Sequence, residues 1–317
     1  MNTHVVLNVM LELFGIMVIG YFFTKRGFFN QEFADKISWL VVNLSMPFLI
    51  ISSVFGKNKQ GSINDILDYL IAGTAFYLVV PVIAFLICKI LLVKKSDKSI
   101  YQFMLVFSNC SFIGYPVLAA AFGDEAIFLS AMFNIPFNIM AFSYGIYLMS
   151  KDSEGKEKFN PKKLINAGVI SSVIAIVIYV GNIPVPAVIG DTLTMVGNMT
   201  TPLSMIVLGI SLAQVPVKDM FSEFKVYPMT IIRLIGLPLL TYYGMSLFTD
   251  NLMLIQVATG TAAMPAASLT VMLTNRYKGN VKLASVIVFI TTLGSVVSIP
   301  FIIGLLLLIY TIQAQKN

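Results

Sequence analysis

The chain has 317 residues, of which 57% are hydrophobic and only 11% are charged. A soluble domain carries roughly 25% charged residues, so this composition excludes an ordinary soluble enzyme and places the chain among membrane proteins. The formal net charge of +6 lies mainly between apolar runs and does not indicate nucleic-acid binding. We therefore expect the lipid bilayer as a partner and no nucleic acid.

Ten apolar runs are long enough to cross a hydrocarbon core of about 30 Å, which takes about 20 helical residues. We predict these runs at residues 5–24, 34–55, 66–93, 100–121, 126–149, 164–180, 187–214, 226–248, 252–274 and 282–312. The expected fold class is an all-α membrane protein with ten transmembrane helices. Cys88 and Cys110 fall inside these runs, where small buried side chains are more typical than a disulfide or a metal site.

Lysine and arginine are distributed unequally over the loops. Seventeen of the 21 lie in every second loop or at the ends of the runs that flank it, starting with the loop after the first run, and three lie on the opposite side. The positive-inside rule places the lysine-rich loops in the cytoplasm and both termini outside. The polar segment 151–163 then becomes a cytoplasmic linker between a first repeat, 1–150, and a second repeat, 164–317.

The two halves share matches in the same order. Asn43-Leu-Ser-Met-Pro47 in the second run recurs as Asn198-Met-Thr-Thr-Pro202 in the seventh. Five spans are an odd number, so the second copy enters the membrane upside down, which predicts a 5+5 inverted repeat. The matched asparagines and prolines are expected to kink and pack their helices.

The fourth and ninth runs carry polar residues, glycine and proline at their centres. Proline breaks or kinks a helix, and hydrocarbon tolerates a broken helix only where protein or a water-filled cavity covers it. Two interrupted spans in corresponding halves indicate a transporter's binding site, where the amides of each following half-helix would face an anion. The alternative is that the polar side chains only satisfy the freed backbone. The candidate substrate-binding residues here are Ser108, Asn109, Ser111, Gly114, Tyr115, Pro116, Thr259, Gly260, Thr261, Met264 and Pro265.

Four polar residues in other runs are further candidates. Arg233 is the one cation well inside a predicted span, where it would neutralise an organic acid, or else reach the interface or pair with Glu223. Asn134 and Asn138 lie one turn apart and would line the cavity or join two helices by a hydrogen bond. Glu12 is the one carboxylate well inside a span, a candidate for ion coupling or for a structural role.

The segment Asn109-Cys-Ser-Phe-Ile-Gly114-Tyr-Pro116 resembles the Asn-x4-Gly-x-Pro motif in the fourth helix of the auxin efflux carrier family. That family includes bacterial malate and malonate permeases and the plant PIN auxin exporters. Ala263-Met-Pro265, followed by Arg276-Tyr277, is similar to the family's second crossover. The resemblance implies that helices 4 and 9 cross at their broken points. It also implies a scaffold of helices 1, 2, 6 and 7, a transport domain of helices 3–5 and 8–10, and a homodimer through the scaffold.

These observations together predict a transporter rather than an enzyme. The expected substrate is a small organic anion, malate-like or malonate-like and by resemblance also auxin-like, carried by an elevator-type alternating-access mechanism. The short loop after the fifth span is typical of a compact permease in the plasma membrane of a prokaryote. No catalytic or metal site and no cofactor is expected, and coupling to Na⁺ or H⁺ stays open. The alternatives are an anion channel, a sensor or assembly subunit, and an ion-coupled carrier similar to the bile-acid/sodium symporters.

Overall fold

The computed structural model describes residues 3–55, 63–151, 167–214 and 223–314. Within these ranges the chain is helical apart from turns, short extended segments and one isolated antiparallel bridge between Ser108 and Ala266. The all-α prediction is therefore confirmed for these ranges. Apart from Lys151, the predicted linker 151–163 lies outside them.

Each of the ten predicted runs coincides with helix in the described residues. Five helices are long and apolar enough to cross a membrane, and shorter apolar helices accompany them. The five are Gln31–Ser52, Ile66–Ile90, Glu125–Ser150, Ala187–Ala213 and Val281–Ile309. These helices support the membrane class that the composition indicates.

The chain divides into two compact units, each built from three stretches of sequence. Unit 1 contains Met1–Ile71, Ser111–Ile135 and Ile165–Gln214. Unit 2 contains Ala72–Cys110, Pro136–Leu164 and Val215–Asn317. The predicted repeat boundaries, and the division into scaffold and transport domain, stay predictions.

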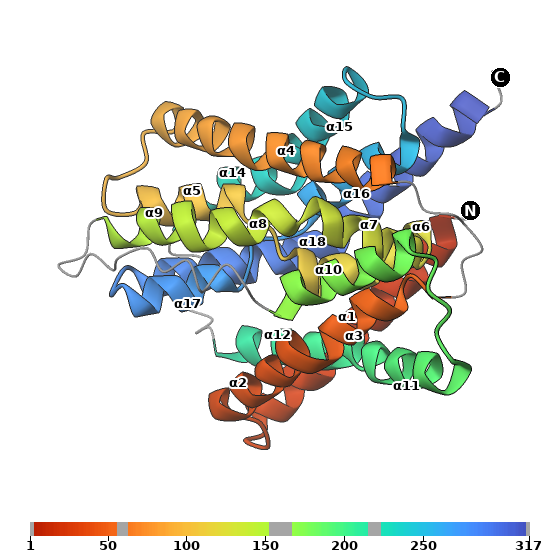
Figure 1. The fold of residues 1–317 in the computed structure, drawn as a ribbon. Helices are drawn as coiled ribbons and strands as arrows, with labels where there is room; N and C mark the ends of the chain where they lie inside the picture. Colours follow the sequence, from red (N-terminus) through yellow and green to blue (C-terminus); the bar gives the residue numbers. More distant parts are fainter. Residues whose placement is uncertain (1–2, 56–62, 152–166, 215–222, 315–317) are drawn as a thin grey trace. The chain divides into compact units, whose positions relative to one another are not determined.

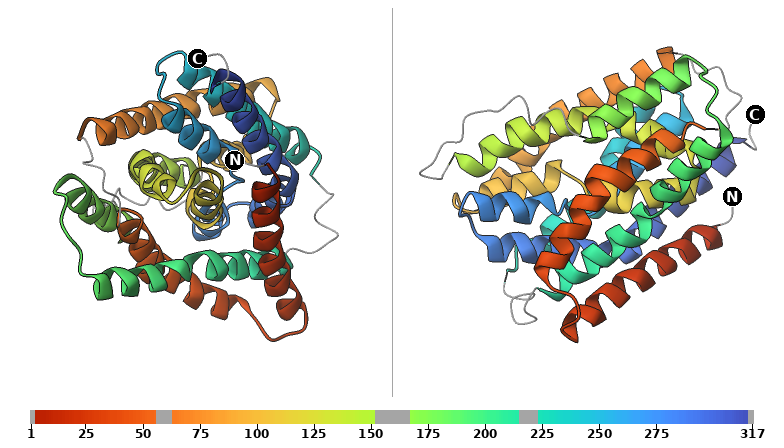
Figure 2. Two further views of the ribbon diagram at one scale, coloured as in Figure 1. Left: turned by 90° about the vertical axis from the view of Figure 1, so that its right-hand side faces the viewer. Right: turned by 60° about the horizontal axis from the view of Figure 1, so that its bottom comes forward.

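Unit 1 consists of helices from the first, second, sixth and seventh predicted spans, together with parts of the fourth and fifth. Its elements, in which η marks a π-helical turn, are α1 (Thr3–Lys25), α2 (Gln31–Leu40), η1 (Val41–Ser45), α3 (Met46–Ser52), η2 (Cys110–Gly114, from Ser111 onward), α6 (Tyr115–Phe122), α7 (Glu125–Phe133), α10 (Ala167–Val180), α11 (Ala187–Asn198) and α12 (Thr200–Ala213). Helix α1 packs along α12, and α3 packs against both α10 and α11 (Figures 1 and 2).

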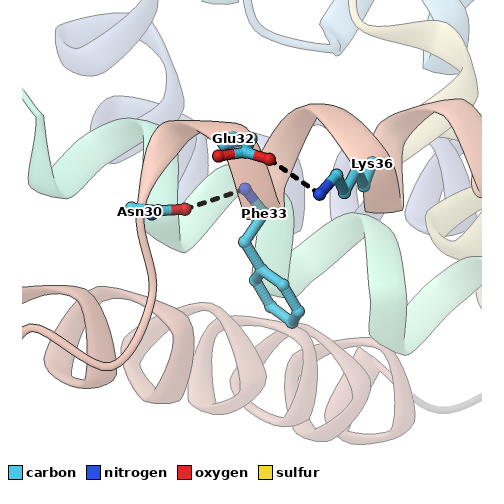
Figure 3. Close-up of polar contacts among 4 residues, drawn as sticks. All are labelled: Asn30, Glu32, Phe33 and Lys36. Atoms are coloured by element: carbon cyan, nitrogen blue, oxygen red, sulfur yellow. Dashed lines mark hydrogen bonds and ion pairs between the residues drawn. The ribbon is translucent and has the colours of Figure 1, made fainter.

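The start of α2 shows a helix terminus fixed by local sequence (Figure 3). The side-chain oxygen of Asn30 accepts a hydrogen bond at 2.9 Å from the backbone N–H of Phe33, which has no partner within the helix. One turn on, Lys36 forms an exposed ion pair with Glu32 at 2.7 Å. Exposed pairs of this kind contribute little, so the cap is the stronger determinant of where α2 begins.

Unit 2 contains the two helices that the interruptions divide. Its elements are α4 (Ile63–Ile90, from Ala72 onward), α5 (Lys98–Val106), α8 (Ile135–Met140), η3 (Ala141–Gly145), α9 (Ile146–Ser150), α14 (Val226–Ile231), η5 (Ile232–Gly236), α15 (Leu237–Ser246), α16 (Leu252–Ala263), α17 (Leu269–Arg276) and α18 (Val281–Ala314). Helix α18 contacts α5, α14, α16 and α17, so it forms the centre of this unit (Figure 1).

Glycine allows α1 and α12 to approach closely. A Cβ atom built on Gly20 would lie 2.5 Å from the carbonyl oxygen of Ile206 in α12, and one on Gly209 would overlap the backbone of Met17 in α1. Backbone atoms cannot move aside as the end of a side chain can. Small residues at such contacts are typical of helix pairs in membranes.

We expect Gly20→Ala to lower the stability of the purified protein by about 1–3 kcal/mol, because the added methyl group forces α1 and α12 apart. Thermal unfolding in detergent measures the change. Gly15→Ala is the matched control on the same helix, since a Cβ there meets nothing within 4 Å. Equal destabilisation by the two substitutions would show that the close contact does not determine the effect.

Candidate functional site

The interruptions of the fourth and ninth spans pair with each other inside unit 2. The backbone N–H of Asn109 donates to the carbonyl of Pro265 at 2.8 Å, and the N–H of Ala267 donates to the carbonyl of Phe107 at 3.0 Å. The two segments run antiparallel, with Ser108 opposite Ala266. Each broken helix therefore supplies hydrogen-bond partners for the backbone of the other.

The second interruption follows directly from its proline. A residue before proline is pushed into extended conformation, and Met264 has φ −68° and ψ 148°, so α16 ends at Ala263. Pro265 itself has no N–H and uses only its carbonyl, as the acceptor for Asn109.

The first interruption does not fall at its proline. The chain becomes extended at Phe107, whereas Pro116 lies in the first turn of α6, after the π-helical turn η2. Because Cys110–Phe122 is one continuous helix, Pro116 lies inside it, and the π-helical turn directly before it is a local distortion of the kind that a missing N–H causes. The sequence predicts a break or kink at Pro116. The π-helical turn before Pro116 is the kink, and the extended segment at Phe107 lies seven or more residues earlier.

A threonine that we did not single out from the sequence supports the crossing. The hydroxyl of Thr291 in α18 accepts a hydrogen bond from the N–H of Ala266 at 3.2 Å and donates to the carbonyl of Ile287 at 2.7 Å. Thr291 is fully buried. The adjacent pair Thr291-Thr292 inside an apolar run could have indicated this role from the sequence, because polar side chains in a membrane helix need hydrogen-bond partners.

Several side chains around the crossing are buried without a hydrogen-bond partner. Asn109 is 4% exposed and Thr261 fully buried, and neither the Asn109 Nδ2 nor the Thr261 hydroxyl has a partner in the structure. The same is true of the hydroxyls of Ser108 and Thr259. Unpaired polar groups in an interior are costly and rare. These four residues are therefore the strongest candidates for ligand contact, and Gly260, Met264 and Pro265 are buried beside them in sequence.

Arg233 also belongs to unit 2 and lies on the π-helical turn η5. Its side chain is fully buried, and its Nη1 donates to the carbonyl of Leu105 in α5 at a long 3.5 Å. It forms no ion pair with Glu223, and its complete burial is inconsistent with a side chain that reaches the membrane surface. Tyr77 and Cys110 lie close enough to interact with its charge.

An aromatic cluster holds the extended segment at Phe107. Its ring lies 4.5 Å from the ring of Phe103 and 5.4 Å from that of Phe137, measured between centroids. Tyr77 contacts Phe137 edge-on at 5.7 Å. Packed aromatic pairs contribute beyond the area that they bury, so the cluster restricts how the first interruption can move.

The remaining candidates of the fourth span belong to unit 1. Gly114, Tyr115 and Pro116 are buried, and Ser111 is half-buried. Because Pro116 has no N–H to offer, the carbonyl of Phe112 one turn earlier lacks its usual helical partner.

A serine on α12 lies beside this carbonyl. The hydroxyl of Ser204 is 3.2 Å from the carbonyl oxygen of Phe112, although it is also 2.6 Å from the carbonyl of Thr200 on its own helix. Ser204 was not predicted from the sequence, because its position four residues after Thr200 is that of an ordinary contact within a helix.

The two asparagines of the fifth span fall in different units, Asn134 in unit 1 and Asn138 in unit 2. Asn134 is buried, and its amide donates to the carbonyl of Ser130 at 2.8 Å, inside its own helix. Asn138 is half-buried on α8. Their predicted role in lining a cavity stays a prediction.

The expected kink residues and Glu12 lie in unit 1. Asn43 is in η1, with its amide donating to the carbonyl of Trp39 at 2.9 Å, and Pro47 begins α3. Asn198 ends α11, and Pro202 lies in the first turn of α12. Glu12 is exposed on α1.

No group of three or more His, Cys, Asp or Glu side chains comes together in the part of the chain that the structure describes. Cys88 and Cys110 are buried, as expected for small apolar side chains. The site is thus a set of neutral amide and hydroxyl groups beside one buried cation.

Long apolar helices, two of them interrupted and paired at their breaks, define a multi-pass membrane protein of the transporter class. The family model described as "Membrane transport protein" matches residues 5–167 and 154–303, which is most of the chain. The chain belongs to this family, the auxin efflux carrier family that its motifs resemble.

Relatives from archaea and bacteria match over nearly their whole length. An uncharacterized transporter of Methanocaldococcus jannaschii is 25% identical over 303 residues, covering 92% of this chain and 96% of the relative. The uncharacterized transporter YfdV of Escherichia coli K12 is 24% identical over 307 residues, covering 92% and 94%. An uncharacterized transporter of Methanothermobacter thermautotrophicus is 23% identical over 306 residues, covering 94% and 96%. The family and these names indicate a membrane transporter and not an enzyme.

We expect Thr291→Val to destabilise the protein by about 1–3 kcal/mol, because the buried N–H of Ala266 loses its acceptor. Thr292→Val is the matched control. The neighbouring hydroxyl is equally buried and has no partner, so its removal is expected to be neutral or stabilising. Thermal unfolding in detergent compares the two, and equal effects would contradict the role given to Thr291.

Proposed function

We propose that this protein carries a small organic anion across the plasma membrane of a prokaryote. The observation that carries the proposal is the antiparallel crossing of the two interrupted helices, with the unpaired side chains of Asn109, Thr259 and Thr261 buried around it. Buried donors without partners cost free energy until a ligand supplies acceptors. A carboxylate has two acceptor oxygens and suits amide, hydroxyl and guanidinium donors.

The proposed substrate class is a malate-like or malonate-like carboxylate, with auxin-like acids as further candidates. The support is the family membership together with the absence of any buried Asp or Glu among the described residues. A site for an organic cation would need such a carboxylate to offset the charge. No cofactor is proposed, and transport driven by a Na⁺ or H⁺ gradient is to be tested.

The proposed architecture is ten membrane spans in a 5+5 inverted repeat, with both termini outside. It is supported by the coincidence of helix with all ten predicted runs and by the antiparallel pairing of the two breaks. An inverted copy must present its broken helix in the opposite direction, which is the relation found between Phe107–Asn109 and Pro265–Ala267.

The proposed mechanism is an elevator, in which helices 3–5 and 8–10 move the site against a scaffold of helices 1, 2, 6 and 7. The division of the chain into two compact units supports it, because all four scaffold spans fall in unit 1. The support is partial, since η2, α6 and α7 fall in unit 1 as well. A homodimer through the scaffold is proposed from the family resemblance.

We expect proteoliposomes containing the protein to take up labelled malonate or malate saturably, with competition by lactate, succinate and indole acetate. Asn109→Ala should reduce uptake at least about tenfold, because one good hydrogen bond to a charged ligand contributes about 1.5–3 kcal/mol. The assay is run with and without Na⁺ and pH gradients to identify coupling. Asn43→Ala is the control, because its exposed amide contacts only its own helix.

Three other results would change the proposal. Current that does not saturate, without stimulation by unlabelled substrate on the far side, would indicate the channel alternative. Uptake that survives Asn109→Ala would move the site away from the crossing. No uptake of any organic acid would contradict the substrate class.

A further inference from the structure

Arg233 is the one buried charged side chain among the described residues. Its guanidinium has no exposed surface, and the structure gives it no ion pair. Nη1 donates to the carbonyl of Leu105, whereas Nε and Nη2 have no hydrogen-bond partner. A buried cation in this state is among the most costly arrangements in a membrane protein.

The helix to which Arg233 is anchored compensates only part of the charge. Leu105 lies in the last turn of α5, where the helix dipole amounts to about −0.5 elementary charge. A guanidinium carries a full positive charge, so the end of α5 compensates only part of it. The titratable groups that interact with its charge are Tyr77 from α4 and Cys110 after the interruption.

The two unpaired nitrogens define one edge of the guanidinium. The N–H bonds of Nε and Nη2 point in parallel away from the side-chain stem, a geometry that matches the two oxygens of a carboxylate. Nη1 lies on the opposite side and is anchored to α5. The long contact with Leu105 thus lies on the Nη1 side, and the Nε–Nη2 edge is left without a partner.

We propose that the Nε–Nη2 edge of Arg233 binds the carboxylate of the transported substrate, and that the site accepts a single negative charge. The inference rests on the proposed function and adds the residue that distinguishes a charged substrate from an uncharged one. The described residues hold one buried cation and no second one. A dicarboxylate would therefore bind as its monoanion, with the protonated carboxyl group at neutral donors such as Asn109 or Thr261.

The guanidinium is fully enclosed in this structure. A substrate reaches it only after neighbouring side chains move, so the described conformation is closed at this edge. The buried charge of Arg233 favours this movement of side chains when an anion is present, because binding of the anion removes the electrostatic cost of burying an unpaired cation.

The charge-retaining and charge-removing variants of Arg233 test the proposal on the purified full-length protein. Isothermal titration calorimetry first identifies which of lactate, malonate, succinate and indole acetate the wild type binds most tightly. That acid and its uncharged amide are then compared on the wild type, Arg233→Gln and Arg233→Lys. Arg276→Gln, which removes an exposed arginine of the same unit, is the matched control.

We expect the wild type and Arg276→Gln to prefer the acid over its amide by about tenfold or more, as for charge-assisted hydrogen bonds. Arg233→Gln loses this preference, while Arg233→Lys keeps it with weaker binding, because an ammonium does not form the bidentate pair. Binding of a dicarboxylate by the wild type strengthens as the pH falls through the second pKa of the acid, and binding of a monocarboxylate does not. Thermal unfolding without ligand checks that each variant is folded, which we expect because the substitution breaks no ion pair and removes only the long hydrogen bond to the carbonyl of Leu105.

The outcomes separate the inference from the proposed function. If the wild type binds an acid and Arg233→Gln still prefers it over the amide, the inference is wrong and the proposed function stands. If Arg233→Lys binds as tightly as the wild type, the bidentate contact is wrong. If the wild type binds none of the acids, the proposed function fails, and the inference fails with it.

Discussion

Backbone amides and carbonyls inside a membrane have no water to bond with, and the crossing in unit 2 depends on this constraint. Two helices are interrupted, and each interruption alone would leave backbone groups without hydrogen-bond partners. The carbonyl of Phe107 and the N–H of Asn109 are satisfied only because Pro265 and Ala267 lie opposite them. Thr291 supplies the remaining acceptor, to Ala266. The two breaks therefore stabilise each other and must lie at the same depth in the membrane.

Proline takes part in this arrangement in two different ways. Pro265 forces the residue before it into extended conformation and so ends α16. Pro116 instead lies inside the continuous helix Cys110–Phe122, just after the π-helical turn η2. Its effect appears one turn earlier, at the carbonyl of Phe112, which lies near the hydroxyl of Ser204. Similar motifs in the two halves thus have different local consequences, because neighbouring helices supply different partners.

The backbone of the crossing is paired, but several of its side chains are not. A structural core with this many unpaired donors would be unfavourable, whereas a site that binds and releases a ligand needs donors that no protein group occupies. Asn109 and Thr261 fit that description among the neutral groups, and Arg233 among the charged ones. Functional sites are where a protein departs from the rules of good packing.

The sequence by itself determined the membrane class, the position of the helices and the two interrupted segments, because apolar length and proline act locally. It also singled out Asn109 and Arg233, since a polar group within an apolar run is visible without a structure. Only the tertiary structure decided that the first break falls at Phe107 and not at Pro116, and that Thr291 accepts a hydrogen bond from the second break. Hydrogen-bond partners far apart in the chain meet only when helices pack, and no local pattern records which donor will find an acceptor and which will be left for a ligand.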